Sequence, residues 1–313
     1  MNIKTCEFVS PKHPDKLCDL IADSILDAYL REDPLSRVAV EVMGGHGHIS
    51  ISGEVSSRAK VNIESIVKAV VGEEYAVHQY LVEQSSQIAQ GVDTGGAGDQ
   101  GIMVGYACDE TKSLMPKEYE LARNLCQKIY EKYPYDGKTQ VTLRDGEVDT
   151  VVASFQSTES DQLSKLVKET IKARRYLINP AGPWTLGGLD ADSGLSGRKI
   201  VIDAYGPNVP VGGGSFSGKD YTKVDRSGAY MARKIARDLL VKHSAREVTV
   251  RLAYAIGVKD PVMALATLDG ERLEITEYDL SPSAIRSFLR LNEQTFTDTA
   301  VWGHFGRGFS WDS

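Results

Sequence analysis

A helix followed by a β-hairpin and a second helix is predicted three times along this chain, and this repeat constrains the fold more than any other feature. The leading helices are predicted over about 14–30, 117–132 and 225–242, so the units begin roughly 105 residues apart. Helix–hairpin–helix units are common, and chance recurrence is the alternative. The near-equal spacing favours three related α+β domains with antiparallel-rich sheets, each covered on one face, around a common centre.

Hairpins and closing helices complete the three units. We predict hairpins over 37–42 with 48–55, 139–143 with 147–155, and 247–256 with 262–268, and closing helices near 62–71, 160–173 and 282–290. Turns are expected at Gly44-Gly45 and Asp145-Gly146. The domains are predicted to span 1–93, 94–184 and 185–313, and a ligand site at their junction would draw residues from the whole chain.

Charge and cysteine usage narrow the class of protein. A net charge of -7 argues against general nucleic-acid binding, which requires a basic surface. The four cysteines are widely separated and have no zinc-site spacing, which favours a reducing compartment. No apolar run has the length of a membrane span and no signal peptide is recognised, so we expect a cytoplasmic protein without a membrane partner.

Residues 212–220 nearly spell a phosphate-binding P-loop. Gly213 is followed by four residues and then by Gly218-Lys219, but Asp220 stands where that motif needs Ser or Thr to hold magnesium. A carboxylate there would face the phosphates that the loop's amides and lysine cradle. A P-loop kinase or NTPase is therefore the alternative function, and it requires a strand that ends at Gly213.

Other junctions carry charges that suit a polyphosphate with metal ions. His13 lies where the first helix begins and free amides attract an anion, and Asp15 is a candidate magnesium ligand. Arg198 and Lys199 precede a predicted strand at 200–204. The glycine-rich segment 90–101 predicts a lid loop.

Each of these groups also has an ordinary interpretation, as a helix-dipole charge, a surface linker or a strand-flanking charge. Aspartates recur every four residues on the first helix, at 15, 19, 23 and 27, and we interpret them as a solvated helix face. These ordinary interpretations are less convincing when all the groups are considered at once, because so many cations and carboxylates fall in glycine-rich junctions of all three units of an acidic chain.

Taken in order, these motifs resemble those of the methionine adenosyltransferase (S-adenosylmethionine synthetase) family. Gly96-Ala97-Gly98-Asp99-Gln100-Gly101 and the segment 212–227 are similar to the two family signatures. The resemblance runs from His13-Pro14-Asp15-Lys16 to Gly303-His304-Phe305-Gly306-Arg307. It implies three related domains about a pseudo-threefold axis. It also implies synthesis of S-adenosylmethionine from ATP and L-methionine, with hydrolysis of the displaced triphosphate to phosphate and diphosphate.

The resemblance also implies roles for individual residues. The catalytic residues would be His13, Lys138, Arg198, Lys199 and Lys219, and the ATP site would add Asp136, Trp184, Asp192 and Ser215. The methionine contacts would be Glu54, Gln90, Asp192 and Lys223. Two Mg²⁺ ions would be held by Asp15 and Asp225, and K⁺ by Glu41. The gating loop would contain Gln90, Asp93, Gly95 and Asp99. The family's active sites form between two subunits, so a homodimer is expected, with pairing into tetramers left open.

Three departures from the family pattern concern the surroundings of the site. Lys12 stands where the family has Gly, the family's Thr-Gly-Arg-Phe appears as Ala181-Gly182-Pro183-Trp184, and the gating loop between Asp93 and Gly96 is cut to Thr94-Gly95. We expect less complete closure over the substrates, and therefore a wider substrate range with the reaction unchanged.

Overall fold

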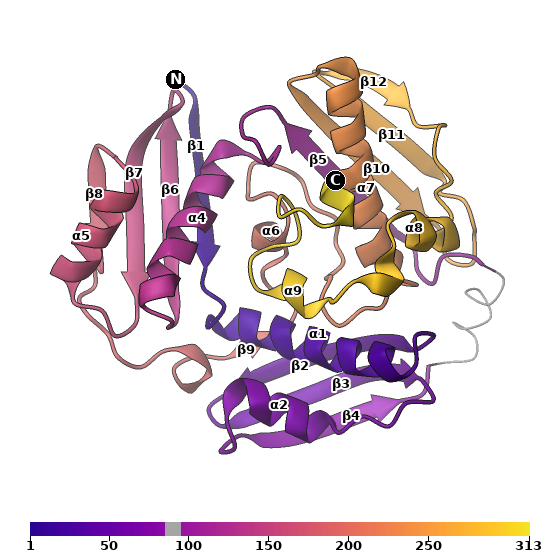
Figure 1. The fold of residues 1–313 in the computed structure, drawn as a ribbon, viewed down its shortest axis with the longest axis horizontal. Helices are drawn as coiled ribbons and strands as arrows, with labels where there is room; N and C mark the ends of the chain where they lie inside the picture. Colours follow the sequence, from indigo (N-terminus) through magenta and orange to yellow (C-terminus); the bar gives the residue numbers. More distant parts are fainter. Residues whose placement is uncertain (85–94) are drawn as a thin grey trace.

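Three four-stranded sheets form the framework of the computed structural model, which describes residues 1–84 and 95–313 (Figure 1). Sheet I has the strand order β4 (Ala76–Val82), β3 (His48–Ser56), β2 (Arg37–Gly45) and β9 (Gly194–Leu195). Sheet II has the order β1 (Ile3–Val9), β6 (Gly137–Arg144), β7 (Glu147–Phe155) and β8 (Arg175–Ile178). Sheet III has the order β12 (Glu271–Glu274), β11 (Met263–Leu268), β10 (Glu247–Tyr254) and β5 (Gly101–Cys108).

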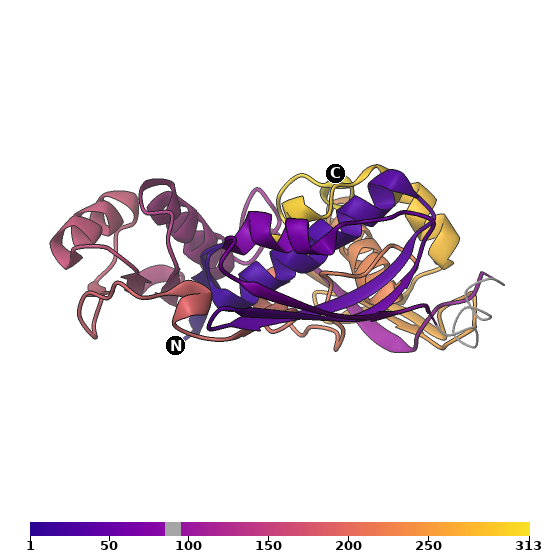
Figure 2. The same ribbon diagram turned by 90° about the horizontal axis from the view of Figure 1, so that it is seen from below.

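The helices lie on one side of the molecule and the sheets on the other (Figure 2). The three long ones are α1 (Pro14–Glu32), α4 (Lys117–Lys132) and α7 (Val224–His243), and they pack on sheets I, II and III. The shorter ones are α2 (Ile63–Val71), α5 (Ser160–Thr170), α6 (Ile200–Asp203), α8 (Pro282–Phe288) and α9 (Thr297–Ala300), with 3-10 turns η1 (Gly188–Asp190), η2 (Leu291–Glu293) and η3 (Ser310–Asp312). The predicted α+β fold with three related units is confirmed.

Each sheet contains one edge strand that comes from another part of the chain. β1 pairs with β6, β5 pairs with β10, and β9 pairs with β2, antiparallel in each case. Segments of the three units are thereby linked by main-chain hydrogen bonds within each sheet. Since the sequence predicted only the local hairpins, this exchange is new information from the structure.

Two local predictions were wrong. The first hairpin turns at His46-Gly47, where φ is 51° and 81°, as a two-residue hairpin turn requires. Gly44 lies within β2 instead, paired with Ile49, and a Cβ there would come 2.5 Å from the Ile49 side chain, which accounts for the glycine. Residues 200–203 form helix α6 rather than a strand: the Asp203 amide donates to the Lys199 carbonyl over 2.8 Å, and Ile202 is buried in the core, so tertiary packing overrides the β-propensity of Ile200-Val201-Ile202.

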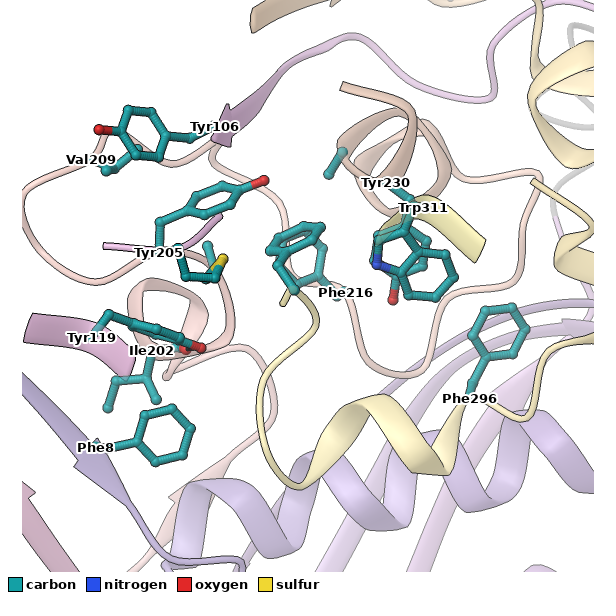
Figure 3. Packing of buried hydrophobic residues seen from close by; sticks show 14 of the residues in the cluster. Phe8, Tyr106, Tyr119, Ile202, Tyr205, Val209, Phe216, Tyr230, Phe296 and Trp311 are labelled. Carbon is teal, nitrogen blue, oxygen red and sulfur yellow. Dashed lines mark hydrogen bonds between the residues drawn. The ribbon is translucent and has the colours of Figure 1, made fainter. Parts of the chain in front are cut away.

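Aromatic side chains fill the centre where the three units meet (Figure 3). Tyr230 stacks on Trp311 with ring centroids 3.8 Å apart, and Tyr205 stacks on Phe305 at 4.7 Å. Both partners come from the C-terminal segment, which passes through the middle of the molecule (Figure 1). Within the part of the chain that the structure describes, no helix combines the length and apolarity needed to cross a membrane.

Candidate functional site

The entry to α1 is the centre of the candidate site. Pro14 occupies the first turn, and His13 caps the helix by accepting the Asp15 amide on Nδ1 over 3.2 Å. Burial lowers the pKa of His13 to about 3, with further contributions from the charges of Lys199 and Lys138. His13 is therefore neutral near pH 7. Because Nδ1 accepts, its proton is on Nε2.

Asp15 ties this helix end to the Arg198-Lys199 pair. Its carboxylate accepts the Leu195 amide over 3.0 Å, forms an ion pair with Lys199 Nζ, and lies 3.7 Å from Arg198 Nε. Burial alone would raise the pKa of Asp15, but the hydrogen bonds from Lys199 and Leu195 outweigh it and lower that pKa. The structure thus joins two segments that are far apart in the sequence.

A second part of the site is formed by the start of β6 in sheet II and by the segment 184–192 that follows this sheet. Asp136 precedes β6 and accepts the Gly188 amide over 3.0 Å, and burial raises the pKa of Asp136. The Trp184 ring lies beside Gly187, where a Cβ would come 2.8 Å from the indole. Lys138 and Asp192 are exposed and close enough to His13 to act on its charge. Asp136 and Trp184 thus both lie against the segment Gly187-Gly188.

The glycine-rich segment 212–223 does not have P-loop geometry. Residues 196–212 are all described and contain no strand, and α7 begins at Val224, well after Gly218-Lys219. Lys219 forms an ion pair with Asp225 at 2.7 Å and Lys223 one with Asp220 at 2.6 Å. The P-loop alternative is therefore not supported.

Asp220 has a structural role. Its buried carboxylate accepts the Val38 and Thr222 amides, each over 2.7 Å, so it fixes the loop to the start of β2. Asp220, the residue that departs from the Walker pattern, thus helps to hold the start of β2 in place. Both of its carboxylate oxygens accept hydrogen bonds from within the protein.

The Glu41 carboxylate on β2 lies beside two serine hydroxyl groups. Ser196 Oγ donates to one carboxylate oxygen, and Ser215 Oγ lies 3.4 Å from the other. Glu54 faces the same side of sheet I, since it lies two residues from Ser52, the register partner of Glu41. Among the described residues, no cluster of three or more His, Cys, Asp or Glu side chains is arranged to hold a metal ion.

The gating-loop residues are only partly covered. Gln90 and Asp93 lie outside the described residues. Gly95 has a φ of 84°, and the Asp99 side chain accepts the Gln100 amide over 2.8 Å. Ala97 is anchored to the strand end after β10, exchanging hydrogen bonds with Val258 and Gly257 over 2.9 and 2.8 Å. The second end of this loop is therefore fixed on sheet III.

Our interpretation of the aspartate row on α1 was wrong. Asp15, Asp19, Asp23 and Asp27 are all buried, with exposed fractions of 2%, 1%, 0% and 8%. Each accepts at least one main-chain amide from the segment 195–297 in the C-terminal part of the chain. The four-residue spacing was visible in the sequence, but nothing local reveals that loops cover this helix face.

Comparisons with known proteins agree over the whole chain. Family models for the N-terminal, central and C-terminal domains of S-adenosylmethionine synthetase match residues 1–92, 94–184 and 186–313. The chain is 41% identical to the S-adenosylmethionine synthase of Desulforudis audaxviator over 367 aligned positions, covering 97% of this chain and 93% of the relative. It is 39% identical to that of Paracoccus denitrificans over 368 positions, covering 98% and 95%. These alignments are longer than the chain's 313 residues, so the relatives carry residues that it lacks.

A solved structure is similar as well. The structure described as an unusual S-adenosylmethionine synthetase from Campylobacter jejuni superposes with a TM-score of 0.89 at 32% identity. The match covers 100% of this chain and 97% of that one.

Proposed function

The chain belongs to the S-adenosylmethionine synthetase family, and we propose that the sulfur of the substrate methionine attacks ribose C5′ of ATP, after which the displaced triphosphate is hydrolysed to phosphate and diphosphate. It is a methionine adenosyltransferase, with ATP and methionine as substrates. A thioether sulfur is a polarizable nucleophile, so it needs alignment with the C5′–O bond and no protein base. The demanding task is to stabilise the departing triphosphate.

The observation that carries this proposal is the gathering of cations at the start of α1. Lys199 forms an ion pair with Asp15, Arg198 lies beside the same carboxylate, and Lys138 and Lys199 both act on the pKa of His13. These cations would bind the phosphates and stabilise the charge that develops on the leaving oxygen. His13, which is neutral with its proton on Nε2, would donate a hydrogen bond to that oxygen.

The other residues would orient the substrates. Trp184 would stack on adenine, and Asp136, Asp192 and Ser215 would complete the ATP site. Glu54, Gln90, Asp192 and Lys223 would hold methionine, and Lys219 would bind phosphate together with Arg198 and Lys199. Lys219 pairs with Asp225 and Lys223 with Asp220, so both ammonium groups already lie at the glycine-rich segment.

The residues present fit the divalent metal that the family needs. Asp15 and Asp225 supply the carboxylate oxygens that Mg²⁺ prefers, and Mg²⁺ commonly relies on one or two protein carboxylates with substrate phosphates as the other ligands. A lysine pairs with each carboxylate and can turn to a phosphate instead. The two ions would neutralise phosphate charge. For K⁺, Glu41 with the Ser196 and Ser215 hydroxyls supplies oxygen donors.

A homodimer with active sites at the subunit interface is part of the proposal. The sheets occupy the side of the molecule opposite the helices (Figure 2). On sheets I and III, Met43, Tyr80, Val82 and Ile102 are 57%, 65%, 62% and 55% exposed. Apolar side chains gathered on sheet faces are typical of an interface between subunits. A mass measurement in solution would distinguish dimers from tetramers.

A cytoplasmic location also belongs to the proposal. Cys6, Cys18, Cys108 and Cys126 are buried free thiols. Free thiols at every cysteine position are typical of proteins in a reducing compartment.

One incubation tests the reaction. With ATP, methionine, Mg²⁺ and K⁺, we expect a sulfonium product and methionine-dependent release of both phosphate and diphosphate. Phosphate release that is independent of methionine would point to an NTPase and contradict the proposal.

A lysine substitution tests the site. Lys219→Met should lower turnover by about 100-fold or more, because a phosphate-binding cation is lost. Lys242→Met is the matched control, since Lys242 pairs with Glu277 at 2.7 Å on the surface of α7. Unchanged turnover of folded Lys219→Met protein would remove Lys219 from the phosphate site.

A further inference from the structure

Two cation-bearing loops are held on α1 by the same local arrangement. Gly197 has a φ of 77°, and its amide donates to Asp19 Oδ1 over 2.9 Å. Gly218 has a φ of 80°, and its amide donates to Asp23 Oδ1 over 2.9 Å. Arg198 and Lys199 follow the first glycine, and Lys219 follows the second.

Both glycines are required by the close approach of these loops to their neighbours. A Cβ on Gly218 would come 2.1 Å from the Val40 carbonyl oxygen, and one on Gly197 would come 2.5 Å from Ser215 Cβ. Positive φ is strained for other residues as well. Each loop therefore makes a left-handed turn whose amide points at a helix carboxylate, immediately before the residues that carry positive charge.

The helix fixes the spacing of the two attachments. Residues four apart on a helix lie on one face, about 6 Å apart along its axis. Asp19 and Asp23 are 1% and 0% exposed, and their remaining oxygens are engaged by Lys16 and Arg226 over 3.0 and 2.8 Å. Neither carboxylate can turn away without leaving a buried charge unpaired.

We propose that Asp19 and Asp23 are positioning residues that hold the Arg198-Lys199 and Lys219 loops at a fixed separation, so that both engage one polyphosphate. This rests on the proposed function, because it assumes that these cations bind the triphosphate of ATP. The α1 side chains act through the loops, while His13 and Asp15 at the helix start belong to the site itself.

Three substitutions of Asp19 test this. Asp19→Ala removes the acceptor for Gly197 and should lower kcat by about 100-fold, the loss that a displacement of about 1 Å can cause. Binding of inorganic tripolyphosphate, measured by calorimetry without turnover, should weaken by at least about 10-fold. Asp19→Asn keeps an acceptor oxygen and should recover most of both. Asp19→Glu keeps the charge but shifts the oxygen, and it should behave like Asp19→Ala; it also serves if Asp19→Ala does not fold.

Asp27→Ala is the matched control on the same helix face. Asp27 accepts the Phe296 and Thr297 amides over 2.8 and 2.9 Å, in a segment without the cations of the site. It should lower the melting temperature but leave tripolyphosphate binding unchanged. Wild-type binding by both Asp19→Ala and Asp19→Glu, or an equal loss in Asp27→Ala, would overturn the positioning role. Failure of wild-type protein to form the sulfonium product would instead overturn the proposed function.

Discussion

The ion pair between Arg226 and Asp23 is fully buried, and we predict that removing one of its charges costs much more stability than removing both. Nη1 and Nη2 of Arg226 donate to the two Asp23 oxygens over 2.7 and 2.8 Å, and both side chains are 0% exposed. The guanidinium also donates to the Tyr230 hydroxyl and the Lys219 carbonyl over 2.9 and 3.1 Å. It therefore links α1, α7 and the Lys219 loop.

Arg226→Met fills much of the same volume but leaves the Asp23 carboxylate buried without its cation. The cost of an uncompensated buried charge is about 3–5 kcal/mol. For a chain of 313 residues, each kcal/mol corresponds to about 1.5 °C in melting temperature, so we expect a fall of about 5–7 °C. Asp23→Asn combined with Arg226→Met removes both charges and keeps an acceptor for Gly218, so it should cost only about 1–2 kcal/mol.

Calorimetric melting at one fixed protein concentration measures these differences, since association would otherwise shift the transition. Arg290→Met is the control: its partner Glu293 and Arg290 itself are 53% and 70% exposed, so the expected change is below about 1 kcal/mol. A single variant within about 1 kcal/mol of wild type, or a double variant as unstable as the single, would refute the argument that the isolated charge dominates.

Three further predictions concern pH, assembly and substrate range. Burial, together with the charges of Arg226 and Lys16, lowers the pKa of His304 well below its ordinary value. The unfolded chain therefore binds a proton that the folded chain does not. The stability that comes from keeping His304 neutral is fully present above about pH 6.5. We expect the free energy of unfolding to fall by about 2 kcal/mol as the pH falls from about 7 to 5. His304→Gln should lose less stability over that range, and an unchanged acid dependence of the urea midpoint would contradict this. Val82→Lys should give monomers in light scattering, with low activity. Val241→Lys is the control, since Val241 is 67% exposed on α7, and it should change neither. An active Val82→Lys dimer would exclude the exposed face of the sheets as the interface. Because the gating loop is short in sequence, we expect turnover of S-ethyl homocysteine, and strict rejection of it would count against incomplete closure.

The elements that the sequence predicted well are those with local signals. The helices at α1, α4 and α7 follow from apolar periodicity, and the hairpin at β6 and β7 follows from Asp145-Gly146, whose φ values of 49° and 85° match a two-residue turn. The short strand β8 was missed, because it depends on parallel pairing with β7. The pairing of β1 with β6 joins residues 129 to 141 positions apart, and no local pattern encodes it.

The candidate site, too, was predictable only where its signals are local in the sequence. Its cations were predictable, since lysine and arginine next to glycine are visible in the sequence. Their partners were not: the ion pairs of Lys199 with Asp15 and of Lys219 with Asp225 depend on how distant or folded-back segments meet. Charges repeating on a helix are solvated unless other segments cover them, and α1 is covered by loops that begin some 180 residues later.

The near-P-loop illustrates why residue identity alone misleads. In a P-loop the glycine-rich backbone presents its amides to phosphate. Here the Gly218 amide is donated to Asp23, and a Cβ on Gly214 would come 2.1 Å from the Asp225 carboxyl carbon, so that glycine makes room for a side chain. Since those groups are engaged within the protein, our proposal assigns phosphate recognition to the lysine and arginine side chains that the loops carry. If the loops bind one triphosphate in this way, they must keep their spacing, and the Gly197 and Gly218 amides that fix it are held by the buried Asp19 and Asp23 of α1.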